Sequence, residues 1–197
     1  MELKEIHLDP VPRIRTERLV LRELGPQDVG PLFEMRSDAR TMQHIGRPRA
    51  TMQEDAMDLI HRSVEARKSN EGCTWSLTFP DADECLGTIG YYRLKKEHYR
   101  GEIGYMLHPD HWGKGLMGEA LRALVAHGLS AIGFHSIEAI TDPDNTRSNR
   151  LLERHGFQRE GLLLESYFHN GRFYDSAIYC IRKGMGLDPE DVELRYL

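Results

Sequence analysis

Alternation of apolar and polar side chains predicts several β-strands along the chain. Residues 18–24 alternate with one interruption, and a turn around Pro26 follows them. Alternation returns in residues 74–79 and 86–94, and a further strand is expected over residues 100–108. Because only short turns separate these last three segments, the sequence predicts an antiparallel meander.

A helical period replaces the alternation elsewhere. Thr51 to Glu54 has the Thr-x-x-Glu form of a capping box, and the apolar spacing after it predicts a helix over residues 51–70. Residues 113–131 carry an apolar face with the same period. The remaining predicted elements are a short helix after Pro26, a strand at 136–141, a helix at 146–155, and strands at 158–167 and 172–181.

Size and composition are typical of one soluble domain. The chain has 197 residues, of which 40% are hydrophobic and 29% charged. It contains no apolar run of about 20 residues, the length that crosses a bilayer, and it does not start with a secretory signal. Its 3 cysteines form no pair at redox or metal-ligand spacing. We therefore expect a cytoplasmic protein with no membrane partner.

Net charge excludes a general attraction to nucleic acid. The formal charge is −5, so we expect no nucleic-acid partner, and any anionic ligand has to be held by local geometry. An acidic surface of this kind suits a cationic acceptor molecule.

The most informative segment is a glycine-rich run that connects a predicted strand to a predicted helix. A helix start offers unpaired backbone N–H groups and a partial positive charge to an anion. Gly113 and Gly115 would let this backbone approach a diphosphate, and Lys114 could add a charged contact. A plain glycine turn and helix cap would look the same. The run matches neither a Walker-type nor a Rossmann motif.

The segment from Gly101 to Phe157 resembles the acetyl-CoA-binding core of the GNAT family of N-acetyltransferases, in particular its RimJ/RimL branch of ribosomal-protein N-terminal acetyltransferases. The family's pyrophosphate loop has the motif Arg/Gln-x-x-Gly-x-Gly/Ala, in which x is any residue. Gly115 fits this pattern, whereas Trp112 departs at the first position and Met117 at the last. Because the loop would bind through backbone N–H groups, the departures are compatible with binding.

Residues 142–157 form a second matching block within that segment, and residues 16–22 and 170–175 extend the resemblance over most of residues 13–182. It implies a single-domain α/β GNAT fold with a mixed, mostly antiparallel twisted sheet of about seven strands. A splayed central strand pair and helices on both faces belong to that expectation. The expected boundaries are an N-terminal extension at 1–12, an N-acetyltransferase domain at 13–183 and a C-terminal tail at 184–197, which could contact a second subunit in a homodimer.

The resemblance also implies how acetyl-CoA, the expected cosubstrate, would bind. The strand through residues 104–107 would splay from the 136–141 strand and open a slot for pantetheine, although ordinary sheet pairing is the alternative. A backbone N–H near Met106 would polarise the thioester carbonyl. The expected cofactor-binding residues are Met106, Leu107, His108, Gly113, Lys114, Gly115, Leu116, Met117, Gly118, Asn145 and Ser148.

A carboxylate that accepts a proton from the attacking amine would assist acetyl transfer. Glu102 is the first candidate, because it lies just upstream of the expected acetyl position on the same strand. A solvated strand glutamate is the other interpretation of this residue. Glu165, on a late strand, is the second candidate, and a chain of water molecules is a third possibility.

A proton donor for the leaving thiolate is expected near the start of the 146–155 helix. The resemblance assigns that role to Ser148 and an orienting role to Asn145, although both residues are also typical helix caps. Tyr167 and Tyr174 are the alternative acids. Three arginines of the same predicted helix could contact the CoA phosphates: Arg147, Arg150 and Arg154.

These features predict an acetyl-CoA-dependent transferase that acts on a primary amine, by direct attack in a ternary complex. A protein N-terminal amine of the ribosomal-protein type is the leading acceptor. The alternatives are a small amine (polyamine, amino acid or antibiotic) and a non-catalytic acetyl-CoA-binding sensor. No metal is expected, because His108 and His111 lack a third ligand at suitable spacing.

Overall fold

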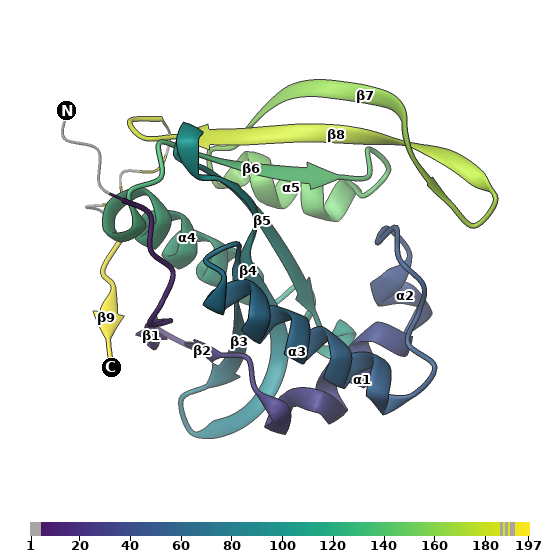
Figure 1. Cartoon of the computed structure of the whole chain (residues 1–197), viewed down its shortest axis with the longest axis horizontal. Helices are drawn as coiled ribbons and strands as arrows, with labels where there is room; N and C mark the ends of the chain where they lie inside the picture. The colour runs from purple at the N-terminus through teal and green to yellow at the C-terminus, as the bar shows by residue number, and fades with distance from the viewer. Residues whose placement is uncertain (1–4, 186, 188, 190–191) are drawn as a thin grey trace.

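A twisted sheet of nine strands forms the centre of the molecule (Figure 1). The computed structural model describes residues 5–185, 187, 189 and 192–197, so residues 1–4 of the expected N-terminal extension and residues 186, 188 and 190–191 of the expected tail lie outside the described part. The strand order is β7-β8-β6-β5-β4-β3-β2-β1-β9. The strands are β1 (Ile14–Arg15), β2 (Val20–Glu23), β3 (Cys73–Phe79), β4 (Ala82–Lys95), β5 (Arg100–Leu107), β6 (Ser136–Thr141), β7 (Gln158–His169), β8 (Arg172–Arg182) and β9 (Arg195–Tyr196).

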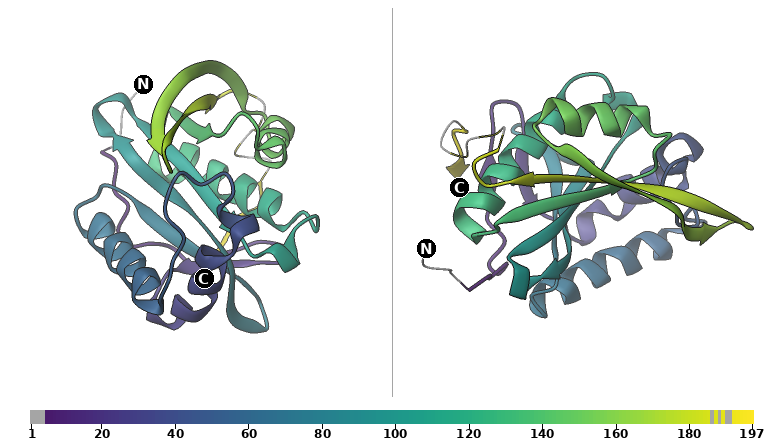
Figure 2. Two further views of the ribbon diagram at one scale, coloured as in Figure 1. Left: turned by 90° about the vertical axis from the view of Figure 1, so that its right-hand side faces the viewer. Right: turned by 90° about the horizontal axis from the view of Figure 1, so that it is seen from above.

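Helices cover both faces of this sheet, as the view from above makes clear (Figure 2). One face carries α1, α2 and α3, and the other carries α4 and α5. The α-helices are α1 (Val29–Ser37), α2 (Ala39–Met42), α3 (Gln53–Lys68), α4 (Leu116–His127) and α5 (Thr146–Arg154). The shorter helical segments are η1 (Pro26–Asp28), η2 (Lys96–His98), η3 (Pro109–His111) and the π-turn η4 (Gly128–Ile132).

The predicted meander is confirmed, and β3, β4 and β5 pair with one another in antiparallel order. The expected number of about seven strands is wrong, since β1 and β9 join the sheet as strands of 2 residues each. The predicted capping box at Thr51 is also wrong by one position. Asp55, rather than Glu54, accepts the backbone N–H groups of Thr51 and Met52, at 2.7 and 3.3 Å.

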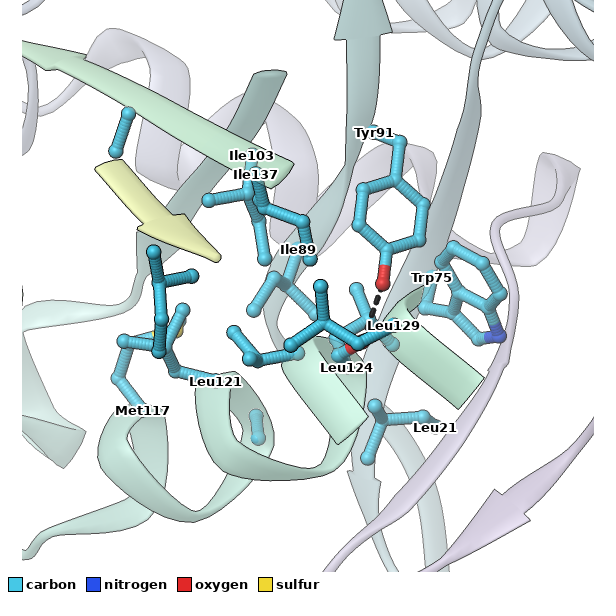
Figure 3. Packing of buried hydrophobic residues seen from close by; sticks show 14 of the residues in the cluster. Leu21, Trp75, Ile89, Tyr91, Ile103, Met117, Leu121, Leu124, Leu129 and Ile137 are labelled. Carbon is cyan, nitrogen blue, oxygen red and sulfur yellow. Dashed lines mark hydrogen bonds between the residues drawn. The ribbon is translucent and has the colours of Figure 1, made fainter. Parts of the chain in front are cut away.

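The main core lies between the sheet and α4, and its largest side chains come from the meander (Figure 3). Trp75 and Tyr91 are fully buried, with ring centroids 5.8 Å apart in an edge arrangement. The Tyr91 hydroxyl donates a hydrogen bond to the backbone carbonyl of Leu124 in α4. These two aromatic residues therefore anchor the helix to the sheet.

The centre of the sheet opens between β5 and β6, the one parallel pair in the described sheet. The two strands pair only at Arg100–Ser136, Gly101–Ile137 and Glu102–Glu138. Beyond Glu102, β5 continues to Leu107 paired with β4 alone, while β6 continues to Thr141 paired with β8. The expected splayed strand pair is thus present, and it separates just past Glu102.

Among the residues that the structure describes, no helix has the length and apolar character needed to cross a membrane.

Candidate active site

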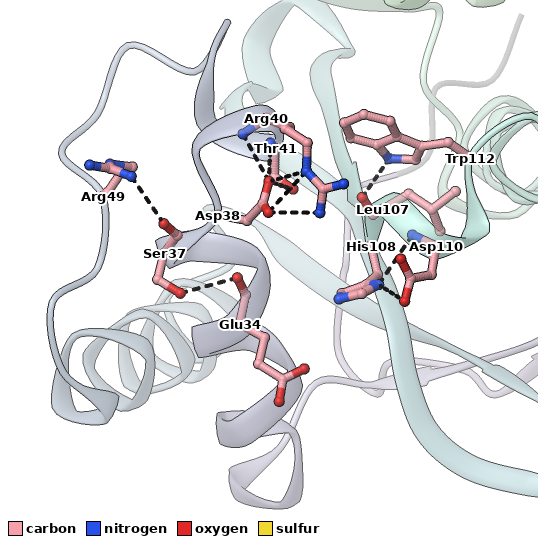
Figure 4. A network of polar contacts seen from close by, with 10 residues as sticks. All are labelled: Glu34, Ser37, Asp38, Arg40, Thr41, Arg49, Leu107, His108, Asp110 and Trp112. Atoms are coloured by element: carbon pink, nitrogen blue, oxygen red, sulfur yellow. Dashed lines mark hydrogen bonds and ion pairs between the residues drawn. The ribbon is translucent and has the colours of Figure 1, made fainter.

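The glycine-rich loop lies at the end of β5 and leads directly into α4. Gly113 and Gly115 both have φ near +75°, a left-handed conformation in which a side chain would be strained. Trp112, just before them, donates its indole N–H to the Leu107 carbonyl at 2.8 Å (Figure 4). This bond folds the loop back toward the strand end and orients the following backbone.

The backbone N–H groups of residues 113–118 form the anion-binding part of this loop. Within the described chain none of them has a hydrogen-bond acceptor, and the first bond of α4 runs from Glu119 N–H to the Gly115 carbonyl at 3.2 Å. The side chains of Leu116 and Met117 are buried in the core, so only their main chain is free to bind a ligand. The arrangement fits a diphosphate bound by backbone N–H groups and the helix dipole.

A carboxylate behind the loop clamps it to the β1–β2 turn. Glu119 accepts hydrogen bonds from the Thr16 hydroxyl at 2.6 Å and from the backbone N–H and Nε of Arg18, both at 2.7 Å. Arg18 in turn donates to the Lys114 carbonyl at 2.9 Å. Burial acts to raise the pKa of Glu119, but the hydrogen bonds from Thr16 and Arg18 outweigh it and lower the pKa. The carboxylate therefore stays charged and holds Arg18 against the loop.

Positive charge beside the loop comes from two sources. The Arg147 guanidinium lies 4.8 Å from the centre of the Trp112 ring, a cation–π contact that brings it next to the glycines. Lys114 is exposed at the rim. Arg150 and Arg154 are exposed on α5 and make no ion pair within the described residues.

Met106, Leu107 and His108, at the end of β5, were expected to bind pantetheine, and they differ in which backbone groups are available for it. The His108 N–H is already used, since it donates to the Leu86 carbonyl at 2.8 Å. The Leu107 carbonyl accepts from Trp112, which leaves one lone pair available. Met106 pairs with Thr88 of β4, and its side chain packs with α1, α2 and α3.

Two hydroxyl groups meet beside the splay. Ser148 Oγ lies 2.7 Å from the Tyr105 hydroxyl oxygen, and either group can be the donor. Burial raises the pKa of Tyr105 to about 12, although the hydrogen bond with Ser148 opposes this rise. Asn145 caps α5, because its Oδ1 accepts the Ser148 N–H at 3.1 Å. The sequence interpretation assigned no role to Tyr105, because nothing local in the sequence indicates a contact 43 residues away.

Glu102 lies at the vertex of the splay, as the last β5 residue that pairs with β6. Its side chain is only 12% exposed and accepts hydrogen bonds from Arg93 Nη1 at 2.9 and 2.7 Å. Burial raises the pKa of this carboxyl, and the positive charge of Arg93 opposes the rise. A largely buried carboxyl of raised pKa is typical of a general base, and it differs from the solvated glutamate of the other interpretation.

The remaining candidates lie farther out, on the β7–β8 hairpin. Glu165 is exposed in an irregular stretch of β7, where φ is +48°. Tyr167 and Tyr174 stack on each other with ring centroids 5.2 Å apart, and both line a cavity under the hairpin. The structure thus brings Ser148 and Tyr105 together beside the splay, with Glu102 at its vertex, and it separates the hairpin residues from that group.

The two histidines considered as metal ligands lie side by side, with ring centroids 6.1 Å apart. His108 Nδ1 accepts the Asp110 N–H at 3.3 Å (Figure 4), and burial lowers the pKa of His111. The described residues contain no group of three or more His, Cys, Asp or Glu side chains placed to hold a metal ion.

Known proteins resemble this chain over most of its length. The Acetyltransferase (GNAT) domain family matches residues 18–158. The uncharacterized N-acetyltransferase YoaA of Bacillus subtilis is 36% identical over 87% of this chain and 97% of its own. The ribosomal-protein-serine acetyltransferase of Escherichia coli is 27% identical over 84% of this chain and 93% of its own. In the solved structures, RimL, a ribosomal L7/L12 alpha-N-protein acetyltransferase bound to coenzyme A, has a TM-score of 0.78 at 21% identity, covering 85% of this chain and 95% of that chain.

Proposed function

The chain belongs to the GNAT family of acetyltransferases, and from this premise we propose that it acetylates the N-terminal amine of a protein. It is an acetyl-CoA-dependent acyltransferase whose relatives include ribosomal-protein acetyltransferases. The names of two relatives support the choice of acceptor, because one acts on a ribosomal-protein serine and the other on a protein α-amine. The acceptor and the roles of individual residues are the parts that we propose.

The separation of β5 and β6 is consistent with a binding slot for the cosubstrate, and the glycine-rich loop is consistent with a binding site for its phosphates. When bound, acetyl-CoA supplies a thioester whose carbonyl carbon an amine can attack. The N–H groups of residues 113–118 would hold the pyrophosphate, with Arg147 and Lys114 beside it. The edge of β5 beyond Glu102, with no strand opposite it, would hold the pantetheine arm and present backbone groups to the thioester oxygen.

Glu102 is the proposed base. Most aqueous amines are protonated at neutral pH, so a carboxylate near the slot that accepts the extra proton produces the nucleophilic form. Its raised pKa makes it a better proton acceptor than an ordinary glutamate, and the positive charge of Arg93 limits that rise. Glu165 is exposed on the hairpin, so it is a less suitable candidate for the base than Glu102.

The Ser148–Tyr105 pair is the proposed proton donor. As the new N–C bond forms and the C–S bond breaks, the sulfur gains a negative charge that a hydroxyl proton can neutralise. The 2.7 Å contact lets one hydroxyl replace the proton that the other gives up, so the two act as a short relay. Asn145 would act through Ser148, because it holds the first turn of α5 in place.

Direct attack in a ternary complex is favoured over an acetylated cysteine. Burial raises the pKa of the thiols of Cys73, Cys85 and Cys180, and the pKa of Cys85 is about 11. All three are buried, so they remain protonated and inaccessible at neutral pH.

The observation that carries the proposal is the splay that opens just past Glu102 with the Ser148–Tyr105 pair beside it. The test is acetyl-CoA-dependent thiol release measured with N-terminal peptides and with small amines, in the wild type and in Ser148→Ala. Release with peptides that falls at least tenfold in the variant is the expected result. CoA binding without release from any acceptor would support a sensor instead, and release with small amines alone would support the rival enzyme.

A further inference from the structure

A cavity of about 360 Å³ lies between the loop that follows α2 and the β7–β8 hairpin. Figure 1 shows α2 beneath the far end of that hairpin, and the second view agrees. The helix α2 contributes Ala39 and Met42, the loop contributes residues 43–49, and the hairpin contributes Tyr167, His169, Asn170 and Tyr174. Gly46 lies so close to the hairpin that a Cβ there would be 2.5 Å from the Tyr167 ring.

One polar contact connects the cavity lining to the segment that carries the proposed site. His44 Nδ1 lies 2.8 Å from Asp142 Oδ2, which ties the loop to the segment that leads into Asn145 and α5.

The charge that lines the cavity is positive. Arg47 and Arg49 both line it, whereas no Asp or Glu does. In the described part of the chain neither arginine pairs with a carboxylate, and the only side-chain bond of Arg49 is a long one, 3.5 Å, to the Ser37 carbonyl. The nearby carboxylates are occupied, since Asp142 binds His44 and Asp38 binds Arg40. This local charge is opposite to the net charge of −5, from which a cationic acceptor was expected.

We infer that the acceptor carries an anionic group next to its amine, and that Arg47 and Arg49 bind this group in the cavity. The inference rests on the proposed function, because it assumes that the amine enters beside Glu102. In a protein acceptor the group is the carboxylate of an Asp or Glu within the first few residues. In a small molecule the same chemistry is its own carboxylate or phosphate. A guanidinium binds either group through paired N–H donors.

The experiment compares acceptors with and without this anionic group, and the peptides among them differ at a single position. Peptides with a free amino terminus carry Asp, Asn or Lys at the second, third or fourth position, and an amino acid, an amino-acid phosphate ester and spermidine represent small amines. Thiol release gives kcat/KM for each. For the wild type the Asp peptide is expected to exceed its Asn counterpart about tenfold, the value for one charge-assisted contact at a partly exposed site.

Three variants connect the preference to the two arginines. In Arg47→Gln/Arg49→Gln the Asp and Asn peptides should agree within about twofold, whereas Arg62→Gln, an exposed arginine of α3 outside the cavity, should keep the wild-type ratio. In Arg47→Glu/Arg49→Glu the preference should reverse toward the Lys peptide. A reversal requires a folded enzyme, so the variant cannot give it by misfolding.

The outcomes separate this inference from the proposed function. Transfer to peptides with no Asp preference, or a preference unchanged in the double variants, overturns the inference and leaves peptide acetylation standing. If the amino acid or the phosphate ester is acetylated with the charge preference but no peptide is, the role of the two arginines is supported and the protein acceptor is overturned. No turnover of any acceptor overturns both.

Discussion

Replacing Glu119 by Gln is expected to weaken CoA binding about tenfold or more without changing turnover much. The carboxylate receives hydrogen bonds from the Thr16 hydroxyl and from the backbone and side chain of Arg18, at 2.6, 2.7 and 2.7 Å. Gln offers a single oxygen and turns an amide N–H₂ toward the guanidinium. Arg18 then loses the partner that holds it on the Lys114 carbonyl, and the glycine loop loses its support.

The magnitude follows from the exposure of the pair. A hydrogen bond to a charged group contributes about 1.5–3 kcal/mol when it is buried. The Glu119 side chain is 16% exposed but that of Arg18 is 46% exposed, so solvent screens the ion pair and the lower end applies. A loss of about 1.5–2 kcal/mol, expressed in the loop conformation that binds the pyrophosphate, corresponds to a Kd that is about 10- to 30-fold higher.

The assay is calorimetric titration with CoA, combined with steady-state kinetics and thermal unfolding. Arg18→Ala should raise the Kd by a similar factor, and the double variant should add little, because both changes remove the same clamp. Glu97→Gln, at an exposed glutamate of η2, is the matched control. A Kd within about twofold of the wild type, together with a lower Tm, would refute the reasoning, since Glu119 would then stabilise the fold without positioning the loop.

Three other changes give separable results. Glu102→Gln should lower kcat/KM about 100-fold and abolish the acidic limb of its pH profile, which in the wild type should fall through a pKa above 4.5, and an unaltered profile would exclude this base. Tyr105→Phe should lower kcat about tenfold and add little to Ser148→Ala, because the two hydroxyls act as one unit, and full additivity in single-turnover rates would contradict the relay. Burial lowers the pKa of His127 to about 4 from an ordinary 6.5, so between pH 6.5 and pH 4 the unfolded chain binds a proton that the folded chain does not. The free energy of unfolding should therefore fall by roughly 3 kcal/mol from its value above pH 6.5 as the pH is lowered to 4. Urea unfolding of His127→Gln should lack this loss, and an identical pH dependence in both proteins would exclude His127 as its cause.

Local patterns in the sequence predicted most of the fold. The meander, α4 and the β7–β8 hairpin depend on periodicity and turn residues that lie within a few positions of one another. The two short strands β1 and β9 could not be found this way, because two residues have no period. β1 joins the sheet by pairing with β2, and β9 joins it by pairing with β1 across almost the whole chain, at Ile14–Tyr196 and Arg15–Arg195.

The same limit applies to the candidate site. The glycine loop and the strand that carries Glu102 are local features, and the sequence indicated both. Contacts that join distant segments, such as Ser148 with Tyr105 and Glu119 with Arg18, have no local signal. The positive charge of the cavity between α2 and the β7–β8 hairpin was also missed, because net charge averages over the whole surface and does not say which side chains the loop after α2 presents.

Tandem mass spectrometry of the product tests most directly whether this chain acetylates a protein N-terminal amine, as we propose. Wild-type protein is incubated with acetyl-CoA and a peptide that contains both a free amino terminus and an internal lysine. We expect the acetyl group on the N-terminal nitrogen, with the yield strongly reduced in Glu102→Gln. Acetylation of the lysine side chain alone, or of small amines but no peptide, would contradict it.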